Sequence, residues 1–239
     1  MATATRTVTY ADQETALTGF LTWDEATPRP QPGLLLMRGG AGLDEHARGQ
    51  ARRYAALGYA VLAGDMFGAG VAGNRERVLA CLLALRDDPR LLTRRGEAGL
   101  AALAACPEVD GRLAAVGFCF GGLAVLTLAR SGAGLSGVVS MHGSLATVRP
   151  AEPGAVGAKV LVCHGALDPH VPMTDVTRFA EEMDHAQADW QLIVYGGAMH
   201  GFTHSHAVPG AMPGVAYNAL ADQRSFAAAR AFLADALNQ

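Results

Sequence analysis

Residues 113–129 read LAAVGFCFGGLAVLTLA, and this stretch decides the fold. An apolar run over 113–118 leads into the turn GFCFGG at 117–122, and a run of helical character follows it. The turn divides the stretch into two pieces that are each shorter than the roughly 18–20 apolar residues of a membrane-spanning helix. A strand that turns sharply into a helix, with glycines flanking a central residue, is typical of a nucleophile elbow, G-x-S-x-G. Here Cys119 takes the place of the serine.

The elbow would place Cys119 where its thiol can react. At the N-terminus of a helix the partial positive charge favours a thiolate, and the backbone N–H of Phe120 can point at an oxyanion. A cysteine in an apolar run is otherwise most often a buried structural residue, which is our interpretation of Cys163. The spacing of the elbow therefore predicts that Cys119 is a nucleophile.

Short apolar runs without alternation recur on both sides of this turn, which is typical of strands buried on both faces. We predict strands at 33–37, 59–63, 113–118, 137–141, 160–163 and 192–195, preceded by a hairpin at 5–10 and 15–23. We predict helices between them at 44–57, 74–85, 89–106, 120–130 and 173–186, and a last helix at 217–237. This alternation indicates an α/β-hydrolase type of fold, with a mostly parallel central sheet and helices on both faces. We expect a single domain over 1–239, in which 67–108 contributes a lid.

Composition excludes several classes of protein. Half of the 239 residues are hydrophobic and 17% are charged, which suits a chain with a sizeable core and not a disordered one. The net charge of −3 provides no basic surplus for a nucleic-acid partner. The start of the chain has no hydrophobic signal core and the four cysteines form no CxxC. We therefore expect a reduced, cytoplasmic setting and no membrane partner.

A second segment that contains a candidate catalytic residue is HGALDPHVP at 164–172, which follows the predicted strand at 160–163. It places Asp168 just beyond the carboxyl end of that strand, where a carboxylate that orients a catalytic base would lie. By itself an aspartate before proline more often forms an Asx turn. In combination with the elbow, Asp168 is predicted as the acid of a catalytic triad.

The third segment is YGGAMHGF at 195–202, a Gly-rich loop that can present His200 at the end of the sheet. The chain order Cys119, Asp168, His200 is the order of nucleophile, acid and base in α/β-hydrolases. His204 and His206 follow closely, but no carboxylate or cysteine completes a metal-ligand spacing there. We expect no metal and no cofactor.

With these motifs the chain resembles the dienelactone hydrolase family of the α/β-hydrolase superfamily from about residue 33 onward. The resemblance rests on GFCFGG, GALDPHVP and YGGAMHGF and on the spacing between them. It implies that Cys119 is the nucleophile, His200 the base, Asp168 its partner, and the backbone N–H groups of Phe120 and Gly40 the oxyanion hole. The implied substrate is a small ester or lactone, cleaved through a thioester acyl-enzyme.

Two positions depart from the family pattern. Dienelactone hydrolases proper have a glutamate in the loop after the 33–37 strand, where it pairs with the resting cysteine, and Gly39 stands there instead. The family archetype also has an arginine shortly after the catalytic histidine that holds the substrate carboxylate. His204 occupies that region and is a weaker, pH-dependent partner for an anion. Both departures disfavour dienelactone as the substrate and leave the hydrolase chemistry unchanged.

Further residues are candidates for the substrate pocket. Arg38 lies near the predicted oxyanion loop and could either attract an anionic substrate or be solvated. His142 follows a predicted strand and would border the pocket. Phe67 and Phe202 would form apolar walls, beside His204.

Two alternatives use the same residues. An acyltransferase or thioesterase would use the same triad, with a different acceptor or a thioester substrate. A catalytically silent homologue would bind a small ligand or sense redox state through oxidation of Cys119. The presence of Asp168 and His200 disfavours the second alternative, because a binding protein has no use for the full set.

Overall fold

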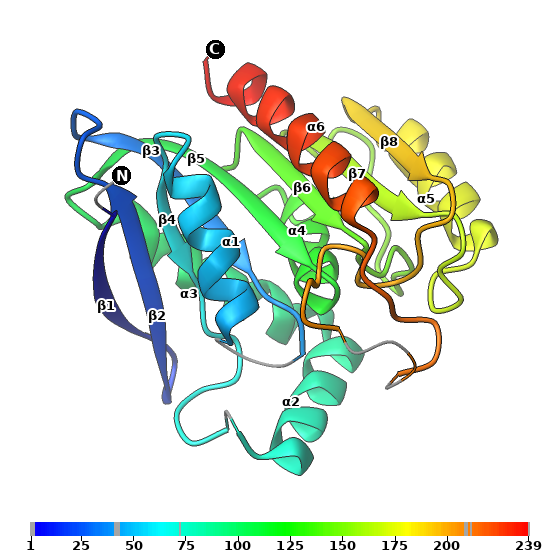
Figure 1. The fold of residues 1–239 in the computed structure, drawn as a ribbon, viewed down its shortest axis with the longest axis horizontal. Coiled ribbons are helices and arrows are strands. Elements are labelled where there is room, and N and C mark those ends of the chain that lie inside the picture. The colour runs from blue at the N-terminus through cyan, green and yellow to red at the C-terminus, as the bar shows by residue number, and fades with distance from the viewer. Residues whose placement is uncertain (1–2, 41–43, 72, 208–209, 211, 239) are drawn as a thin grey trace.

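The centre of the molecule is one eight-stranded sheet with the strand order β1-β2-β4-β3-β5-β6-β7-β8 (Figure 1). The computed structural model describes residues 3–40, 44–71, 73–207, 210 and 212–238. β1 pairs antiparallel with β2 and β2 with β4, while the other neighbours run parallel. Helices lie on both faces, which confirms the predicted α/β-hydrolase architecture.

The elements follow the predicted segments closely: most strands extend the predicted range by a few residues, whereas most helices are one to three residues shorter. The strands are β1 Thr3–Asp12, β2 Thr15–Asp24, β3 Gln31–Met37, β4 Ala60–Ala63, β5 Val109–Phe118, β6 Gly137–Met141, β7 Lys159–Gly165 and β8 Trp190–Tyr195. The helices are α1 Glu45–Ala55, α2 Arg75–Asp87, α3 Pro89–Ala104, α4 Phe120–Arg130, α5 Met173–His185 and α6 Ala219–Leu237.

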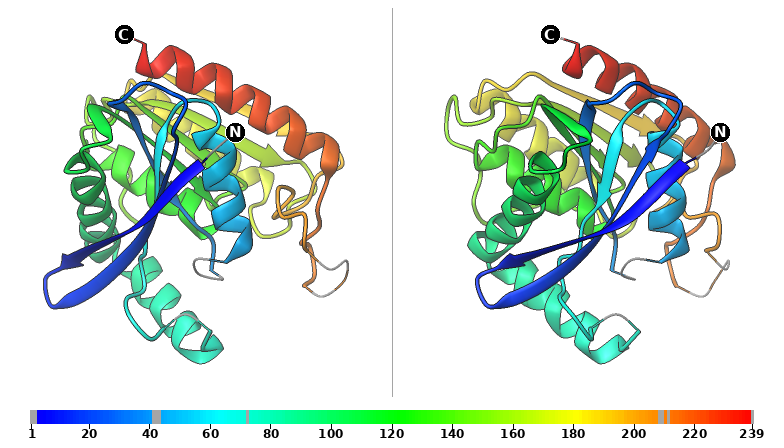
Figure 2. Two further views of the ribbon diagram at one scale, coloured as in Figure 1. Left: turned by 60° about the vertical axis from the view of Figure 1, so that its left-hand side comes forward. Right: turned by 90° about the vertical axis from the view of Figure 1, so that its left-hand side faces the viewer.

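The helices lie on the two faces of the sheet (Figure 2), and an apolar layer lies between them and the sheet on each face. α1 and α6 cover one face, where Tyr54 and Phe232 are buried together with strand residues. α3, α4 and α5 cover the other face, where Leu103 and Phe179 are buried. Because β3 and β4 are covered on both sides, nearly all of their residues are buried, which explains why their sequences do not alternate.

The range 67–108, predicted to contribute a lid, contains two helices with different surroundings. α3 packs against α4 and several strands and buries Leu92 and Leu103, so it belongs to the scaffold. α2 contacts α3, and Leu85 is its one buried residue. Residue 72 lies outside the described residues. A lid therefore stays a prediction, and within this range α2 is the helix that it fits.

The parallel strands end along one edge of the sheet, and this edge carries the residues that the motifs singled out. The loops after β3, β5, β6, β7 and β8 carry Arg38, Cys119, His142, Asp168 and His200 in that order. Ligand sites of open α/β sheets lie at this edge, outside the carboxyl ends of the strands. The apolar stretch 113–129 forms β5 and α4, and in the described part of the chain no helix is long and apolar enough to cross a membrane.

Candidate active site

The turn between β5 and α4 holds Cys119 in a backbone conformation that few residues with a side chain adopt. Its φ is 54° and its ψ is −117°. Positive φ is uncommon outside glycine and persists where the surrounding structure enforces it. The N–H of Cys119 donates to the carbonyl oxygen of Met141 at the end of β6, at 3.0 Å. The elbow predicted from the glycine spacing is present.

Close backbone packing explains the glycines beside Cys119. A Cβ on Gly117 would overlap the backbone of Gly121, the second residue of α4. A Cβ on Gly121 would in turn overlap the carbonyl group of Met37 at the end of β3. The elbow is thus wedged between its own helix and the loop after β3, with no room for a methyl group at either position.

The structure brings Cys119, His200 and Asp168 into one hydrogen-bonded chain. Nε2 of His200 lies 3.0 Å from Sγ of Cys119, and Nδ1 of His200 lies 2.8 Å from Oδ2 of Asp168. The loops after β7 and β8 can approach this closely because of Gly165, where a Cβ would lie 2.7 Å from the carbonyl oxygen of Ala198. These are the three residues that the sequence predicted as a triad.

Asp168 serves two structural purposes at once. One carboxylate oxygen accepts the backbone N–H groups of His170 at 2.8 Å and Val171 at 3.2 Å, which is the Asx turn expected before proline. The other oxygen faces His200. The turn thus holds the carboxylate in place for the histidine, and the side chain of Asp168 is fully buried.

Charge interactions favour an imidazolium at His200. Burial works to lower the pKa of His200, but the hydrogen bonds to Asp168 and Cys119 outweigh it and raise the pKa to about 10. Burial works to raise the pKa of Asp168, but the hydrogen bond to His200 outweighs it and holds the pKa below the usual 3.8. The pair is therefore arranged as carboxylate and imidazolium beside the thiol.

The predicted oxyanion donors lie on the two sides of Cys119. Phe120 is the first residue of α4, directly after the thiol. Gly39 and Gly40 line the cavity in the loop after β3. A Cβ on Gly39 would lie 3.4 Å from Cβ of Cys119, so this loop is in contact with the elbow. The assignment of Phe120 and Gly40 as oxyanion donors stays a prediction.

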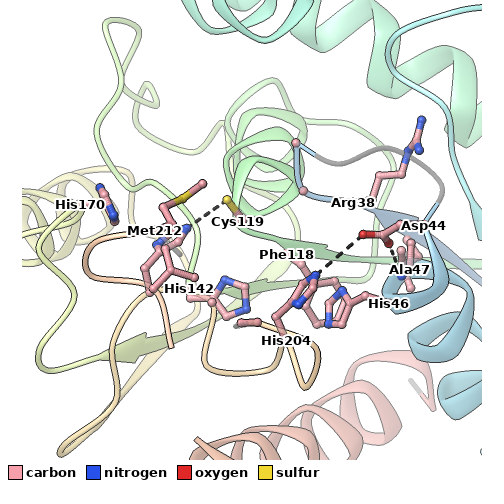
Figure 3. A pocket seen from close by; sticks show the side chains of 17 residues that line it. Arg38, Asp44, His46, Ala47, Phe118, Cys119, His142, His170, His204 and Met212 are labelled. Carbon is pink, nitrogen blue, oxygen red and sulfur yellow. Dashed lines mark hydrogen bonds and ion pairs between the residues drawn. The ribbon is translucent and has the colours of Figure 1, made fainter. Parts of the chain in front are cut away.

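A cavity of about 380 Å³ opens above the thiol (Figure 3). Its walls are mostly apolar atoms, together with a group of histidines that come from different loops. The lining residues in the described part of the chain are Leu36, Arg38, Gly39, Gly40, Asp44, His46, Ala47, Phe118, Cys119, His142, His170, His200, Gly201, His204, Ala207, Met212 and Val215.

The lining residues that the sequence did not single out include Asp44, His46, His170 and Met212. Asp44 and His46 stand where α1 begins, and Met212 belongs to the segment that follows the histidine-rich loop. A capping signal is visible at Asp44, but it predicts a helix start and says nothing about a pocket. The motif at 164–172 contains His170, whose Nε2 donates to the carbonyl oxygen of Pro213 at 3.0 Å.

His46 and His204 form a stacked pair in the wall of the cavity. Their ring centroids lie 4.5 Å apart with an interplanar angle of 25°. Nε2 of His46 donates to the carbonyl oxygen of Thr203 at 3.2 Å, and the Thr203 hydroxyl lies 2.8 Å from Nε2 of His142. His142 and His204 thus border the pocket as the sequence predicted. Thr203 contacts both His46 and His142 and so links them.

Three other pocket predictions need correction. Phe67 does not line the cavity, because its ring packs under the guanidinium of Arg38 in the apolar core. Phe202 is fully buried behind the wall and contacts the ring of His142. Arg38 lines the cavity, but its guanidinium donates to Gly64 and Asp65 and points away from Cys119 (Figure 3). The guanidinium is therefore not solvated, and its charge is paired with that of Asp65.

The histidines do not form a metal site in the part of the chain that the structure describes. No group of three or more histidine, cysteine, aspartate or glutamate side chains is placed there to hold an ion. Cys163 is fully buried, and burial raises the pKa of its thiol to about 12, in keeping with the structural role predicted for it.

Comparison with known proteins agrees with this geometry. A sequence model described as the dienelactone hydrolase family matches residues 17–237. A solved structure named m3DLH is 39% identical, with a TM-score of 0.92 and coverage of 99% of this chain and 100% of that chain. A dienelactone hydrolase-like promiscuous phosphotriesterase, P91, from metagenomic libraries is 38% identical, with a TM-score of 0.92 and coverage of 98% and 99%.

A curated relative from Caenorhabditis elegans, the uncharacterized protein K02A2.1, is 40% identical over 149 residues. That match covers 61% of this chain and 94% of the relative. The family match spans nearly the whole chain, and the two solved structures share its full architecture. This chain belongs to the dienelactone hydrolase family and is a carboxylic ester hydrolase.

Proposed function

We propose that this protein hydrolyses a small carboxylic ester or lactone through a triad of Cys119, His200 and Asp168. The observation that carries the proposal is the continuous chain from Asp168 through His200 to the thiol, with contacts of 2.8 and 3.0 Å. The chain ends at the floor of an apolar cavity, where an ester can lie against Sγ. Nucleophile, base and orienting acid in contact are the requirement for acyl transfer.

In the first half of the reaction Nε2 of His200 takes the proton of the Cys119 thiol, and the resulting thiolate attacks the carbonyl carbon of the ester. A C–S bond forms, and the π electrons move onto the carbonyl oxygen. The backbone N–H groups of Phe120 and Gly40 are the proposed donors to this oxyanion, and one such donor contributes about 2.7–4 kcal/mol. When the intermediate collapses, the C–O bond breaks and the imidazolium of His200 protonates the departing alkoxide through Nε2.

In the second half His200, now neutral, removes a proton from a water molecule through Nε2. The hydroxide equivalent attacks the thioester, the C–S bond breaks, and the acid leaves. The proton returns to the pair formed by His200 and Cys119, so the enzyme is restored. Asp168 holds the imidazole in the required orientation in both halves and stays ionised throughout.

The shape of the pocket supports a small substrate. A volume of about 380 Å³ lies near the lower end of typical small-molecule sites. Apolar walls around Phe118 and Met212 suit short acyl or aryl groups. A dienelactone bears a carboxylate, and the arginine at this pocket is already engaged by Asp65, so an ester without that group is the better match.

The test is hydrolysis of p-nitrophenyl acetate, a longer p-nitrophenyl ester, a neutral lactone and a dienelactone. Wild type is compared with Cys119→Ala, and Cys81→Ser is the matched control because Cys81 lies on α2 and does not line the cavity. We expect loss of turnover in Cys119→Ala alone, and an acyl adduct on Cys119 by mass spectrometry with a slow substrate. Equal rates in all three proteins would refute the thiol nucleophile.

The same panel separates the proposal from its alternatives. Adding an alcohol acceptor diverts product to a new ester if the protein is an acyltransferase, and leaves the free acid as product if it is a hydrolase. Faster turnover of a thioester than of the matched oxygen ester would identify a thioesterase. A redox-sensing or binding homologue would keep a reactive thiol and show no turnover of any ester.

A second candidate activity is hydrolysis of a neutral phosphotriester. P91, which is 38% identical over 98% of this chain, is described as a promiscuous phosphotriesterase. The mostly apolar walls of the cavity favour it, because a triester carries no negative charge. The thiolate would form an S–P bond and expel an aryloxide, and water would then release the phosphodiester. An aryl dialkyl phosphate, tested against Cys119→Ala, checks this activity.

A further inference from the structure

We infer that Asp44 is a specificity-determining residue that makes the pocket select uncharged or cationic esters over esters that carry a carboxylate. The inference rests on the proposed function, since it names the substrate class of that same site. The charged side chains that line the cavity outside the triad support it.

The one arginine or lysine that lines the described cavity does not present its charge to the substrate. Nη2 of Arg38 lies 2.9 Å from Oδ1 of Asp65, and Nε donates to the carbonyl oxygen of Gly64 at 3.1 Å. The side chain of Arg38 is 4% exposed. The residues that the structure leaves undescribed near the cavity in sequence, 41–43, 208–209 and 211, are all uncharged.

Asp44 does present a charge. It is the N-cap of α1, where Oδ1 accepts the backbone N–H of Ala47 at 2.9 Å. The other oxygen, Oδ2, lies 3.8 Å from Nε2 of His204, and the side chain is 32% exposed. Figure 3 shows this carboxylate in the cavity wall, beside the stacked rings of His46 and His204. The capping bond holds one oxygen in place and leaves the carboxylate at the cavity.

His46, His142 and the triad do not offset this charge. Burial, and then the neighbouring ring of His204, lower the pKa of His46. Burial, and then His200, hold the pKa of His142 well below 6.5, so both rings are neutral at physiological pH. In the triad the imidazolium of His200 is balanced by the buried carboxylate of Asp168, 2.8 Å away.

A substrate carboxylate would therefore lose its water and enter a cavity with a negative potential. Two charges inside this cavity of about 380 Å³ are partly buried, and bulk ions screen partly buried charges less than fully exposed ones. An uncharged ester does not meet this penalty, and an ester with a quaternary ammonium group gains from the same field. Rejection through a like charge is an established route to specificity.

The experiment uses three p-nitrophenyl esters of similar size: the butyrate, the hemisuccinate and the 4-(trimethylammonio)butyrate. The readout is the ratio of kcat/KM between charged and uncharged esters, so that a general effect on rate cancels. In wild type we expect the butyrate to exceed the hemisuccinate. In Asp44→Asn we expect this preference to fall roughly tenfold, the size of a charge effect of about 1.4 kcal/mol.

Asparagine is a good N-cap, so Asp44→Asn removes the charge and keeps the helix start. Asp44→Ser is the second variant, because serine also caps a helix. The matched control is Glu45→Gln, which removes a charge one residue away from a side chain that is 71% exposed and paired with Arg52. Glu45 does not line the cavity, and its variant should keep the wild-type ratios.

Raising the salt concentration to about 1 M, where the Debye length falls to about 3 Å, should weaken the wild-type preference and leave the ratio in Asp44→Asn nearly unchanged. A wild type that hydrolyses the hemisuccinate as well as the butyrate would overturn the inference, as would unchanged ratios in both Asp44 variants. In either case Cys119→Ala still tests the proposed function separately. Loss of all ester turnover from wild type would refute the proposed function itself.

Discussion

One carboxylate oxygen of Asp168 lies 2.8 Å from Nδ1 of His200, and its other oxygen accepts the backbone N–H of His170 at the same distance. The two bonds make the position of the imidazole depend on a local turn, and not on long-range packing alone. An Asx turn is a rigid, self-contained unit. The base is thus oriented by a carboxylate whose own orientation is determined within three residues of sequence.

Asp168→Asn is expected to lower kcat/KM by about 10²–10⁴-fold, since the amide stabilises neither the imidazolium nor its tautomer. The turn should survive, because the amide oxygen can still accept the backbone N–H of His170. The pKa of His200 is raised to about 10 in wild type, so the imidazolium is present below that pH and activity falls above it. In the variant the alkaline limb of the pH–rate profile should move toward lower pH. An unmoved limb would contradict the role of Asp168.

Gly39→Glu should place a carboxylate against the thiol, because a Cβ there lies 3.4 Å from Cβ of Cys119 and meets no closer obstacle. A negative charge beside a thiol disfavours the thiolate. The rate of alkylation by iodoacetamide at neutral pH should therefore fall, and esterase activity should fall with it. Gly39→Gln is the uncharged control of the same size, and equal effects of both variants would indicate crowding instead of charge.

Arg38→Met should destabilise the fold by about 3–5 kcal/mol, because it leaves the buried carboxylate of Asp65 without its partner. Arg52→Ala removes an exposed arginine that is paired with Glu45, and should change stability by no more than about 1 kcal/mol. Urea unfolding measures both. If Arg38 instead bound substrate, its variant would unfold normally and show a raised KM for anionic esters.

Gly121→Ala should destabilise the protein by about 2–4 kcal/mol, since the added methyl group overlaps the carbonyl of Met37. Gly134→Ala is the matched control, because a Cβ at Gly134 meets nothing within 4 Å. Thermal unfolding of the two variants compares the positions directly. Similar melting temperatures would show that the elbow has more room than its geometry indicates.

The sequence predicts the catalytic segments well because their signals are local. The glycines at 117 and 121 report a tight turn whatever surrounds it, and each of the other two motifs follows a recognisable strand. The strand before Asp168, β7, is buried as predicted, whereas β8 lies at the edge of the sheet and buries only Tyr195. At Asp168 the expected turn and the expected catalytic contact are both present. The competing interpretations of that residue were not exclusive, because a carboxylate has two oxygens.

The pocket walls are predicted less well because they depend on partners that are distant in sequence. Arg38 turns away from the cavity toward Asp65, which is 27 residues further along the chain. The ring of Phe67 packs against the guanidinium of Arg38 in the core. The ring of His46, at the start of α1, stacks on the ring of His204 in the loop after β8. The direction of a loop side chain is set by such neighbours, and no periodic pattern in the sequence encodes it.

The position of His200 after β8 has a consequence for the chain while it is being made. β8 is the last strand of the sheet in chain order and pairs with β7 alone. Cys119 can form its contact with His200 only after this edge strand has docked. A partly folded chain that contains the elbow but in which β8 has not yet docked therefore has the thiol without the histidine that contacts it. The contact between thiol and imidazole is thus available only once the whole sheet is assembled.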